Sequence, residues 1–258
     1  MLWQQLFSPP RRPANDAHRA FLAGAEPVKL PAHVAIPSGT ALVLRGYRWG
    51  SGARTVLLVY GWGGNVGDFR PLVPMLVKAG FAVVALDLPA HGTSEGKKSN
   101  LLDMSAALAC WVAQSGWPCA LVAHSLWGIA AALLLEHAAG AVEKLVLVST
   151  PVRAESGFDV GFAQLAVPDS IRQLLYERFN RWLGYPMEHF ALAYRQQLRA
   201  RRVLAVYDAL DELVPIGEVQ TYLAAHSDVE QYWVTGVGHY RMFRSEPVRR
   251  CIVQLLTT

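Results

Sequence analysis

Short apolar runs alternate with helical patterns along most of the chain. Six runs rich in β-branched residues follow one another, at 55–61, 81–89, 119–125, 144–150, 202–208 and 230–239. Because they are apolar on both faces, they are typical of strands in a parallel sheet that helices cover on each side. Helical spacing lies between them, over 68–79, 101–115, 127–139, 216–226 and 246–256. This order predicts an α/β fold with a doubly wound, mostly parallel sheet.

Two segments depart from this rhythm. Residues 33–48 have the pattern of two antiparallel strands around the turn at 37–39, which we expect at the sheet edge. Segment 151–200 is rich in aromatic residues and has a helical pattern without an evident strand. An insertion at this place, over the carboxyl ends of the strands, is expected to form a helical cap or lid.

The predicted domain organisation follows from these segments. The core comprises residues 1–150 and 201–258, and the cap comprises 151–200. Within the core, residues 1–32 are expected to form an extended N-terminal arm, which Trp3 and Phe7 pack onto the surface of the fold. At 258 residues, the chain has the length of one large α/β domain.

Composition narrows the functional classes. Hydrophobic residues make up 52% of the chain, but no uninterrupted run reaches the roughly 18 apolar residues of a membrane span. The net charge of +4 comes from scattered arginines, densest at 195–202 and 241–250, which favours solvated helix faces over a nucleic-acid surface. The three cysteines lack metal-like spacing, and the first residues lack a signal-peptide core. We therefore expect a cytoplasmic protein with reduced thiols.

A strand, a serine and a helix follow each other in the stretch LVAHSLWGIA, residues 121–130. This order is typical of a nucleophile elbow, in which small residues normally stand two places on either side of the serine. Here those places hold Ala123 and Trp127 around Ser125. A serine hydroxyl becomes a good nucleophile when an imidazole takes its proton and an acid orients that imidazole.

Candidates for both partners follow later strands. The stretch VLAVYDALDELVP, residues 203–215, places Asp208 and Asp211 at the end of a strand, and GVGHY places His239 on a loop after the next one. The order serine, acid, histidine is that of the α/β-hydrolase elbow enzymes. His91 and His124 are further candidate histidines, and Asp208 is the rival acid.

Four blocks in order carry a family resemblance: GWGGN after the first central strand, DLPAHGTS at 87–94, AHSLWG, and DELVP followed by GVGH. With them the chain resembles the α/β-hydrolase superfamily from about residue 33 to the end. The resemblance implies Ser125 as nucleophile, Asp211 as acid and His239 as base, without a metal or an organic cofactor. Relatives commonly carry glycine at the position of Asp208, which favours Asp211.

The resemblance also assigns supporting roles. Two backbone amides stabilise the oxyanion, and these are expected to be Leu126, at the start of the helix, and Trp62, in the loop after the first central strand. In relatives His91 is structural, and His124 is expected to point away into the sheet side of the elbow.

The chain departs from the family pattern at two aromatic residues. Tyr60 stands where most relatives have histidine, and Trp127 stands where they have glycine. The indole adds about 150 Å² or more of side chain beside the nucleophile. Three interpretations remain open: an adapted active site in which Tyr60 and Trp127 pack together, a variant engineered at these two positions, or an impaired hydrolase that binds ligands. On this basis we expect Trp127→Gly to raise esterase turnover.

The resulting functional prediction is hydrolysis of a small or medium carboxylic ester, thioester or related acyl substrate through an acyl-enzyme at Ser125. The partner is an apolar small molecule, and Phe158, Phe162 and Trp182 are the expected pocket residues. A lyase, a cofactor-free haloperoxidase and a noncatalytic ligand receptor are the alternatives, since one fold hosts many chemistries. The oligomeric state is not predicted.

Overall fold

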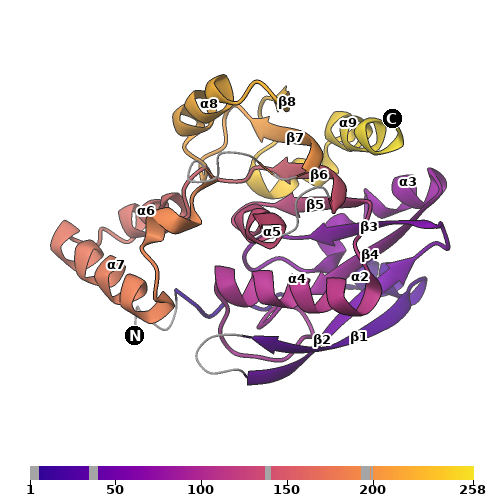
Figure 1. Cartoon of the computed structure of the whole chain (residues 1–258), viewed down its shortest axis with the longest axis horizontal. Coiled ribbons are helices and arrows are strands. Elements are labelled where there is room, and N and C mark those ends of the chain that lie inside the picture. The colour runs from indigo at the N-terminus through magenta and orange to yellow at the C-terminus, as the bar shows by residue number, and fades with distance from the viewer. Residues whose placement is uncertain (1–5, 35–39, 137–140, 193–197, 199) are drawn as a thin grey trace.

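One eight-stranded sheet forms the centre of the protein (Figure 1). The computed structural model describes residues 6–34, 40–136, 141–192, 198 and 200–258. The strands are β1 (Glu26–Val34), β2 (Thr40–Trp49), β3 (Arg54–Val59), β4 (Phe81–Asp87), β5 (Ala120–His124), β6 (Val142–Val148), β7 (Ala200–Asp208) and β8 (Val229–Val234). Their order is β1-β2-β4-β3-β5-β6-β7-β8. β3 to β8 pair in parallel, whereas β2 pairs antiparallel with both of its neighbours, β1 and β4. This mostly parallel sheet confirms the predicted fold class.

Helices cover both faces of this sheet (Figure 1). The α-helices are α2 (Asp16–Ala23), α3 (Val73–Lys78), α4 (Leu101–Ser115), α5 (Trp127–Glu136), α6 (Glu155–Gln164), α7 (Asp169–Leu183), α8 (Ile216–Ala225) and α9 (Glu246–Thr257). The 3-10 helices are η1 (Val66–Phe69), η2 (Met187–Phe190) and η4 (His239–Arg244). Buried residues of α4, α5 and α8 belong to one hydrophobic core, and those of α3 and α9 belong to a second. Alternate residues of β3 enter the two cores because side chains of a strand point to opposite faces.

The sheet edge starts earlier than the sequence predicts. The predicted antiparallel pair exists as β1 and β2, but β1 begins at Glu26, and α2 precedes it. The predicted arm of residues 1–32 is therefore wrong as a simple extended segment. Pro27 and Pro31 hide the strand pattern in the sequence, because proline normally argues against a strand. The structure tolerates them because β1 lies at the edge of the sheet.

The N-terminal arm also enters the core. Phe7 is 2% exposed and packs against Phe179 and Trp182, with ring centroids 5.3 and 4.5 Å apart, so it holds the arm against the fold as a buried residue. Its large apolar ring is buried in a hydrophobic cluster, which removes it from contact with water and stabilises the fold. Trp3, the turn at 37–39, the predicted helix end at 137–139 and the arginine at 195 lie outside the described residues.

Segment 151–200 contains α6, α7 and η2, which connect β6 to β7. In Figure 1 the helices α6 and α7 project to one side of the sheet. Because α6 follows the carboxyl end of β6, the insertion starts at the edge where parallel α/β sheets hold their ligands. Among the described residues, no helix is both long and apolar enough to cross a membrane.

Candidate active site

Ser125 occupies a sharp turn between β5 and α5. Its φ of +58° lies in the left-handed region, which is strained for any residue except glycine. The Ser125 amide donates to the carbonyl of Val148 at 2.8 Å, and the Gly128 amide donates to the Ser125 carbonyl at 2.9 Å. These bonds hold the turn between strand and helix that the sequence predicts.

Two glycines allow other segments to approach this turn. A Cβ atom added to Gly61 would lie 2.9 Å from the Cβ of Ser125, so the loop after β3 touches the elbow. A Cβ atom on Gly128 would lie 2.1 Å from Oγ1 of Thr150. Only a residue without a side chain fits at either place, since real Cβ atoms do not approach so closely.

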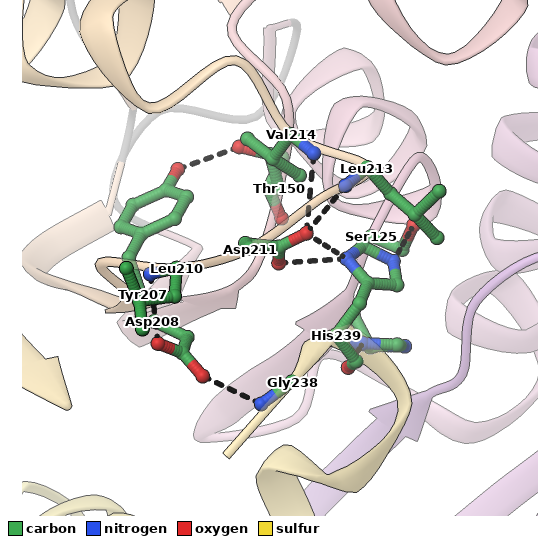
Figure 2. Close-up of polar contacts among 11 residues, drawn as sticks. Ser125, Thr150, Tyr207, Asp208, Leu210, Asp211, Leu213, Val214, Gly238 and His239 are labelled. Atoms are coloured by element: carbon green, nitrogen blue, oxygen red, sulfur yellow. Dashed lines mark hydrogen bonds and ion pairs between the residues drawn. The ribbon is translucent and has the colours of Figure 1, made fainter. Parts of the chain in front are cut away.

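The three candidate catalytic side chains meet in one hydrogen-bonded row (Figure 2). Nε2 of His239 lies 2.9 Å from Oγ of Ser125. Nδ1 of the same ring lies 2.8 Å from Oδ2 and 3.1 Å from Oδ1 of Asp211. The geometry therefore places a base against the serine hydroxyl and an acid against the base.

Asp211 and Asp208 have different partners. Oδ1 of Asp211 also accepts the amides of Leu213 and Val214 at 2.9 and 3.2 Å. Burial alone would raise the pKa of Asp211, but the hydrogen bonds from His239 and Leu213 outweigh it and hold the pKa below its ordinary value. The carboxylate therefore stays ionised opposite the imidazole.

Asp208 anchors the backbone of the loop that carries His239. Its carboxylate accepts the amides of Leu210 and Gly238 (Figure 2), and also the amide of Gly236. Burial raises the pKa of Asp208, but these backbone donors outweigh it and the pKa lies below its ordinary value. The structure brings Asp211, rather than Asp208, to the imidazole ring.

His124 contacts the site more closely than the sequence predicts. Its Nε2 lies 3.0 Å from the carbonyl oxygen of His239, and the two ring centroids are 4.9 Å apart. The ring therefore lies against the backbone of His239 instead of pointing away from it. Burial, together with the neighbouring His239, lowers the pKa of His124 to about 3, so the neutral ring donates this bond. Adjacency to Ser125 in the sequence gave no signal for this contact.

Tyr60 has the partner that its buried hydroxyl requires. The hydroxyl donates to Oδ1 of Asp87 at 3.0 Å and accepts the Leu88 amide at 3.3 Å. His91 lies next to it, with ring centroids 5.8 Å apart, and its Nδ1 contacts the carbonyl of Pro89 at 2.9 Å. The tyrosine thus supports the turn after β4 from the sheet side.

Trp127 is fully buried, with 0% of its surface exposed. Its ring centroid lies 5.7 Å from that of Trp62 and 5.8 Å from that of His91. His91 contacts the rings of both Tyr60 and Trp127. Tyr60 and Trp127 themselves belong to different hydrophobic cores, and among the described residues no ring contact joins them, so the interpretation in which these two residues pack together is wrong. The fold houses the indole while His239 stays within 2.9 Å of Ser125.

The predicted oxyanion donors flank the serine. Trp62 follows Gly61, whose backbone touches the elbow, and Leu126 follows Ser125 directly. Within the described part of the chain, no hydrogen bond uses the backbone amide of either residue. Both amides are therefore open to an acceptor, and Leu126 stands at the N-terminus of α5, where the helix dipole favours negative charge.

A cavity of about 340 Å³ opens beside Ser125 and His239. Its walls include Phe158 and Phe162, two of the three residues expected to contact the substrate. Trp182 is not in the lining, and its prediction as a pocket residue is wrong because its ring packs behind Phe7 and Phe179.

Sequence reasoning missed another part of the wall. Leu6, Phe7 and Arg12 of the N-terminal arm line the cavity, together with Leu101 at the start of α4. The apolar pair Leu6 and Phe7 ahead of two prolines was the available signal. Across the described residues, no group of three or more His, Cys, Asp or Glu side chains is arranged to hold a metal ion.

Comparisons with known proteins agree with this architecture. In a curated relative from Neisseria meningitidis, a pimeloyl-[acyl-carrier protein] methyl ester esterase, 116 residues are 32% identical, covering 44% of this chain and 36% of the relative. A dihydrolipoyllysine-residue acetyltransferase component of an acetoin cleaving system from Cupriavidus necator is 37% identical over 122 residues, covering 45% of this chain and 32% of that protein. The chain thus spans about a third of the length of these relatives.

A solved structure extends the likeness to the whole fold. An esterase from Pyrococcus furiosus superposes with a TM-score of 0.70 at 19% identity, covering 97% of this chain and 96% of that one. A family model described as alpha/beta hydrolase fold matches residues 54–248, well over half of the chain. That range includes the serine turn, both aspartates and His239, and the chain belongs to the alpha/beta hydrolase fold family.

Proposed function

We propose that this member of a hydrolase family cleaves carboxylic esters of small or medium acyl chains, through an acyl-enzyme at Ser125. The observation that carries the proposal is the row of contacts from Oγ of Ser125 to Nε2 of His239, at 2.9 Å, and from Nδ1 of His239 to Asp211, at 2.8 Å. Hydrolase activity at the level of the family is supported by the family match and the esterase relatives.

The proposed reaction has two steps. Oγ of Ser125 attacks the ester carbonyl carbon while Nε2 of His239 takes the hydroxyl proton, and the amides of Trp62 and Leu126 hold the oxyanion. The carbon–oxygen bond to the alcohol then breaks, and His239 returns the proton to the leaving oxygen. Water, deprotonated by His239, then attacks the acyl carbon, the bond from this carbon to Oγ breaks, and His239 returns the proton to Oγ, which releases the acid and free Ser125. Asp211 stays ionised and stabilises the imidazolium in both steps.

The cavity supports an apolar acyl group of limited size. Its volume of about 340 Å³ is near the lower end of the range of about 300–1,000 Å³ for small-molecule sites. Phe158 and Phe162 supply aromatic wall from α6, so we assign segment 151–200 as the cap over the site. Transfer of an apolar ester from water into this cavity is favourable, and the binding free energy is roughly proportional to the apolar area that the ester buries.

The impaired-receptor alternative rests on the bulk of Trp127. The indole is accommodated behind Trp62 and His91, and the hydrogen bonds of His239 are intact beside it. This arrangement favours an active hydrolase over a receptor that has lost its nucleophile. A lyase or a haloperoxidase would use the same side chains, so only substrates distinguish these chemistries.

Hydrolysis of p-nitrophenyl esters with acyl chains of increasing length tests the proposal. We expect turnover that is greatest for short or medium chains, stoichiometric labelling of Ser125 by a fluorophosphonate, and loss of both in Ser125→Ala. Equal rates for the wild-type chain and Ser125→Ala would refute the assignment. An unlabelled serine with retained binding of an apolar ligand would favour the receptor.

A further inference from the structure

The N-terminal strap, residues 6–12, is fastened to the loop that carries Trp62. Nε of Arg12 donates to the carbonyl of Gly63 at 2.8 Å, and Nη2 donates to Oδ2 of Asp68 at 2.7 Å. Oδ2 of Asp68 also accepts the amide of Asn65 at 3.1 Å. One guanidinium therefore fixes a carbonyl next to Trp62 and, through Asp68, the point where the loop enters η1.

Packing adds to these hydrogen bonds. A Cβ atom on Gly63 would lie 2.9 Å from Cγ of Pro10, so the strap rests directly on the loop backbone. Gly63 has a φ of +66°, a left-handed conformation that favours glycine. The sequence GWGGN offers few side chains to hold such a loop, and glycine gives the free loop many other conformations.

We propose that Arg12 is a positioning residue for the oxyanion amide of Trp62. The inference rests on the proposed function, and it adds a part of the chain that the family match, residues 54–248, does not include. An oxyanion donor acts when it is held in place before the reaction, and a misplacement of about 1 Å can lower a rate about a hundredfold. Arg12 also lines the cavity, and its side chain is half exposed, so we expect its main effect on geometry rather than on stability.

The preceding residue provides a matched control. Arg11 donates to the carbonyls of Gly92, Ser94 and Gly96, in the separate loop after β4. It belongs to the same strap, has the same side chain and makes more hydrogen bonds to backbone, but none of these hydrogen bonds reaches the Trp62 loop. Arg11→Ala therefore reports what loosening the strap does by itself.

The experiment compares Arg12→Ala and Arg11→Ala with the wild-type chain. The readouts are kcat and KM for p-nitrophenyl butyrate, the inhibition constant of butylboronic acid, which forms a tetrahedral adduct with serine, and amide hydrogen exchange of the peptide that contains Trp62. For Arg12→Ala we expect kcat to fall about tenfold or more, KM to change less than about twofold, and boronate affinity to fall with kcat. Exchange in the Trp62 loop should accelerate about tenfold. Arg11→Ala should keep kcat within about threefold and leave this exchange unchanged.

Three results would overturn the assignment. They are an unchanged kcat in Arg12→Ala, a faster-exchanging loop without any loss of boronate affinity, and an equal fall of kcat in both variants. The last would make the strap a merely structural element. If the wild-type chain hydrolyses no ester and the fluorophosphonate leaves Ser125 unlabelled, the proposed function itself fails, and the positioning role of Arg12 fails with it.

Discussion

The indole of Trp127 lies against the indole of Trp62, with ring centroids 5.7 Å apart and an angle of 46° between the planes. Trp127 begins α5, the helix after Ser125, and the backbone amide of Trp62 is one of the two proposed oxyanion donors. The two aromatic rings therefore connect the two backbone segments that we propose to hold the oxyanion.

This packing reverses the expectation for Trp127→Gly. Truncation of a fully buried aromatic residue costs about 3–5 kcal/mol, because the cavity left behind collapses only partly. We now expect the variant to have a lower free energy of unfolding and a lower kcat/KM. Urea unfolding and ester kinetics measure both quantities. Trp127→Phe is the matched control, since it keeps a ring against Trp62, and it should lose much less of each. A faster Trp127→Gly enzyme would show that the indole obstructs the site.

Asp208, the last residue of β7, and Asp211, three residues later, should differ in their effects on catalysis. Asp211 contacts the imidazole of His239, so Asp211→Asn should lower kcat by about 10⁴, as the loss of the oriented tautomer does in other serine triads. Asp208→Asn keeps the shape of the group that accepts the loop amides, and we expect a loss of stability with a much smaller effect on kcat. Kinetics and thermal unfolding of both variants test this. The reverse order of kcat would make Asp208 the acid.

The strands and the site side chains were predictable for a common reason. Buried parallel strands carry a continuous apolar run, and the candidate catalytic side chains follow the carboxyl ends of those strands at turns with characteristic residues, as at Ser125 and His239. These signals are local in the sequence. The register of the sheet then brings the strand ends together, and this requires no further information about the side chains.

The N-terminal arm could not be predicted in the same way. Phe7 is buried because α7, more than 160 residues later, presents Phe179 and Trp182 to it. Arg11 and Arg12 are fixed by backbone carbonyls, which leave no trace in the sequence. The contact of His124 with the carbonyl of His239 is hidden for the same reason. Hydrophobic periodicity and sequence motifs do not predict long-range contacts to backbone atoms.

Gly128 should be intolerant of a methyl group. Its added Cβ would overlap Oγ1 of Thr150, at 2.1 Å, and the helix after the nucleophile would have to shift. Overpacking of this kind costs about 1–3 kcal/mol, and a shift of the elbow lowers turnover further. We expect Gly128→Ala to lower both the melting temperature and kcat, and Thr150→Ala to restore part of each in the double variant. Gly217→Ala in α8, where an added Cβ meets no atom within 4 Å and which does not line the cavity, is the control. A Gly128→Ala enzyme with unchanged kcat would mean that the elbow has room to adjust.

Stability should fall at mildly acidic pH because two buried histidines are neutral in the fold. Burial, as the largest cause, lowers the pKa of His91 to about 4 and that of His124 to about 3, against 6.5 for an exposed histidine. The unfolded chain therefore binds protons below pH 6.5 that the folded chain rejects until the pH approaches 4. The stabilisation is complete above pH 6.5 and is lost as the pH falls from there toward the folded pKa values.

We expect the free energy of unfolding to fall by about 2 kcal/mol for each of these histidines between pH 7.5 and pH 5, since one pKa unit corresponds to about 1.4 kcal/mol. The depressed pKa of Asp211 acts only at lower pH, because an aspartate in the unfolded chain titrates near 3.8. Urea titrations at the two pH values measure the difference. His91→Gln should reduce it by about half, whereas His33→Gln, on the exposed edge strand β1, controls for the removal of a surface histidine. If the wild-type chain were equally stable at both pH values, protons would reach these rings without unfolding the protein, and the aromatic packing around His91 would be looser than its burial implies.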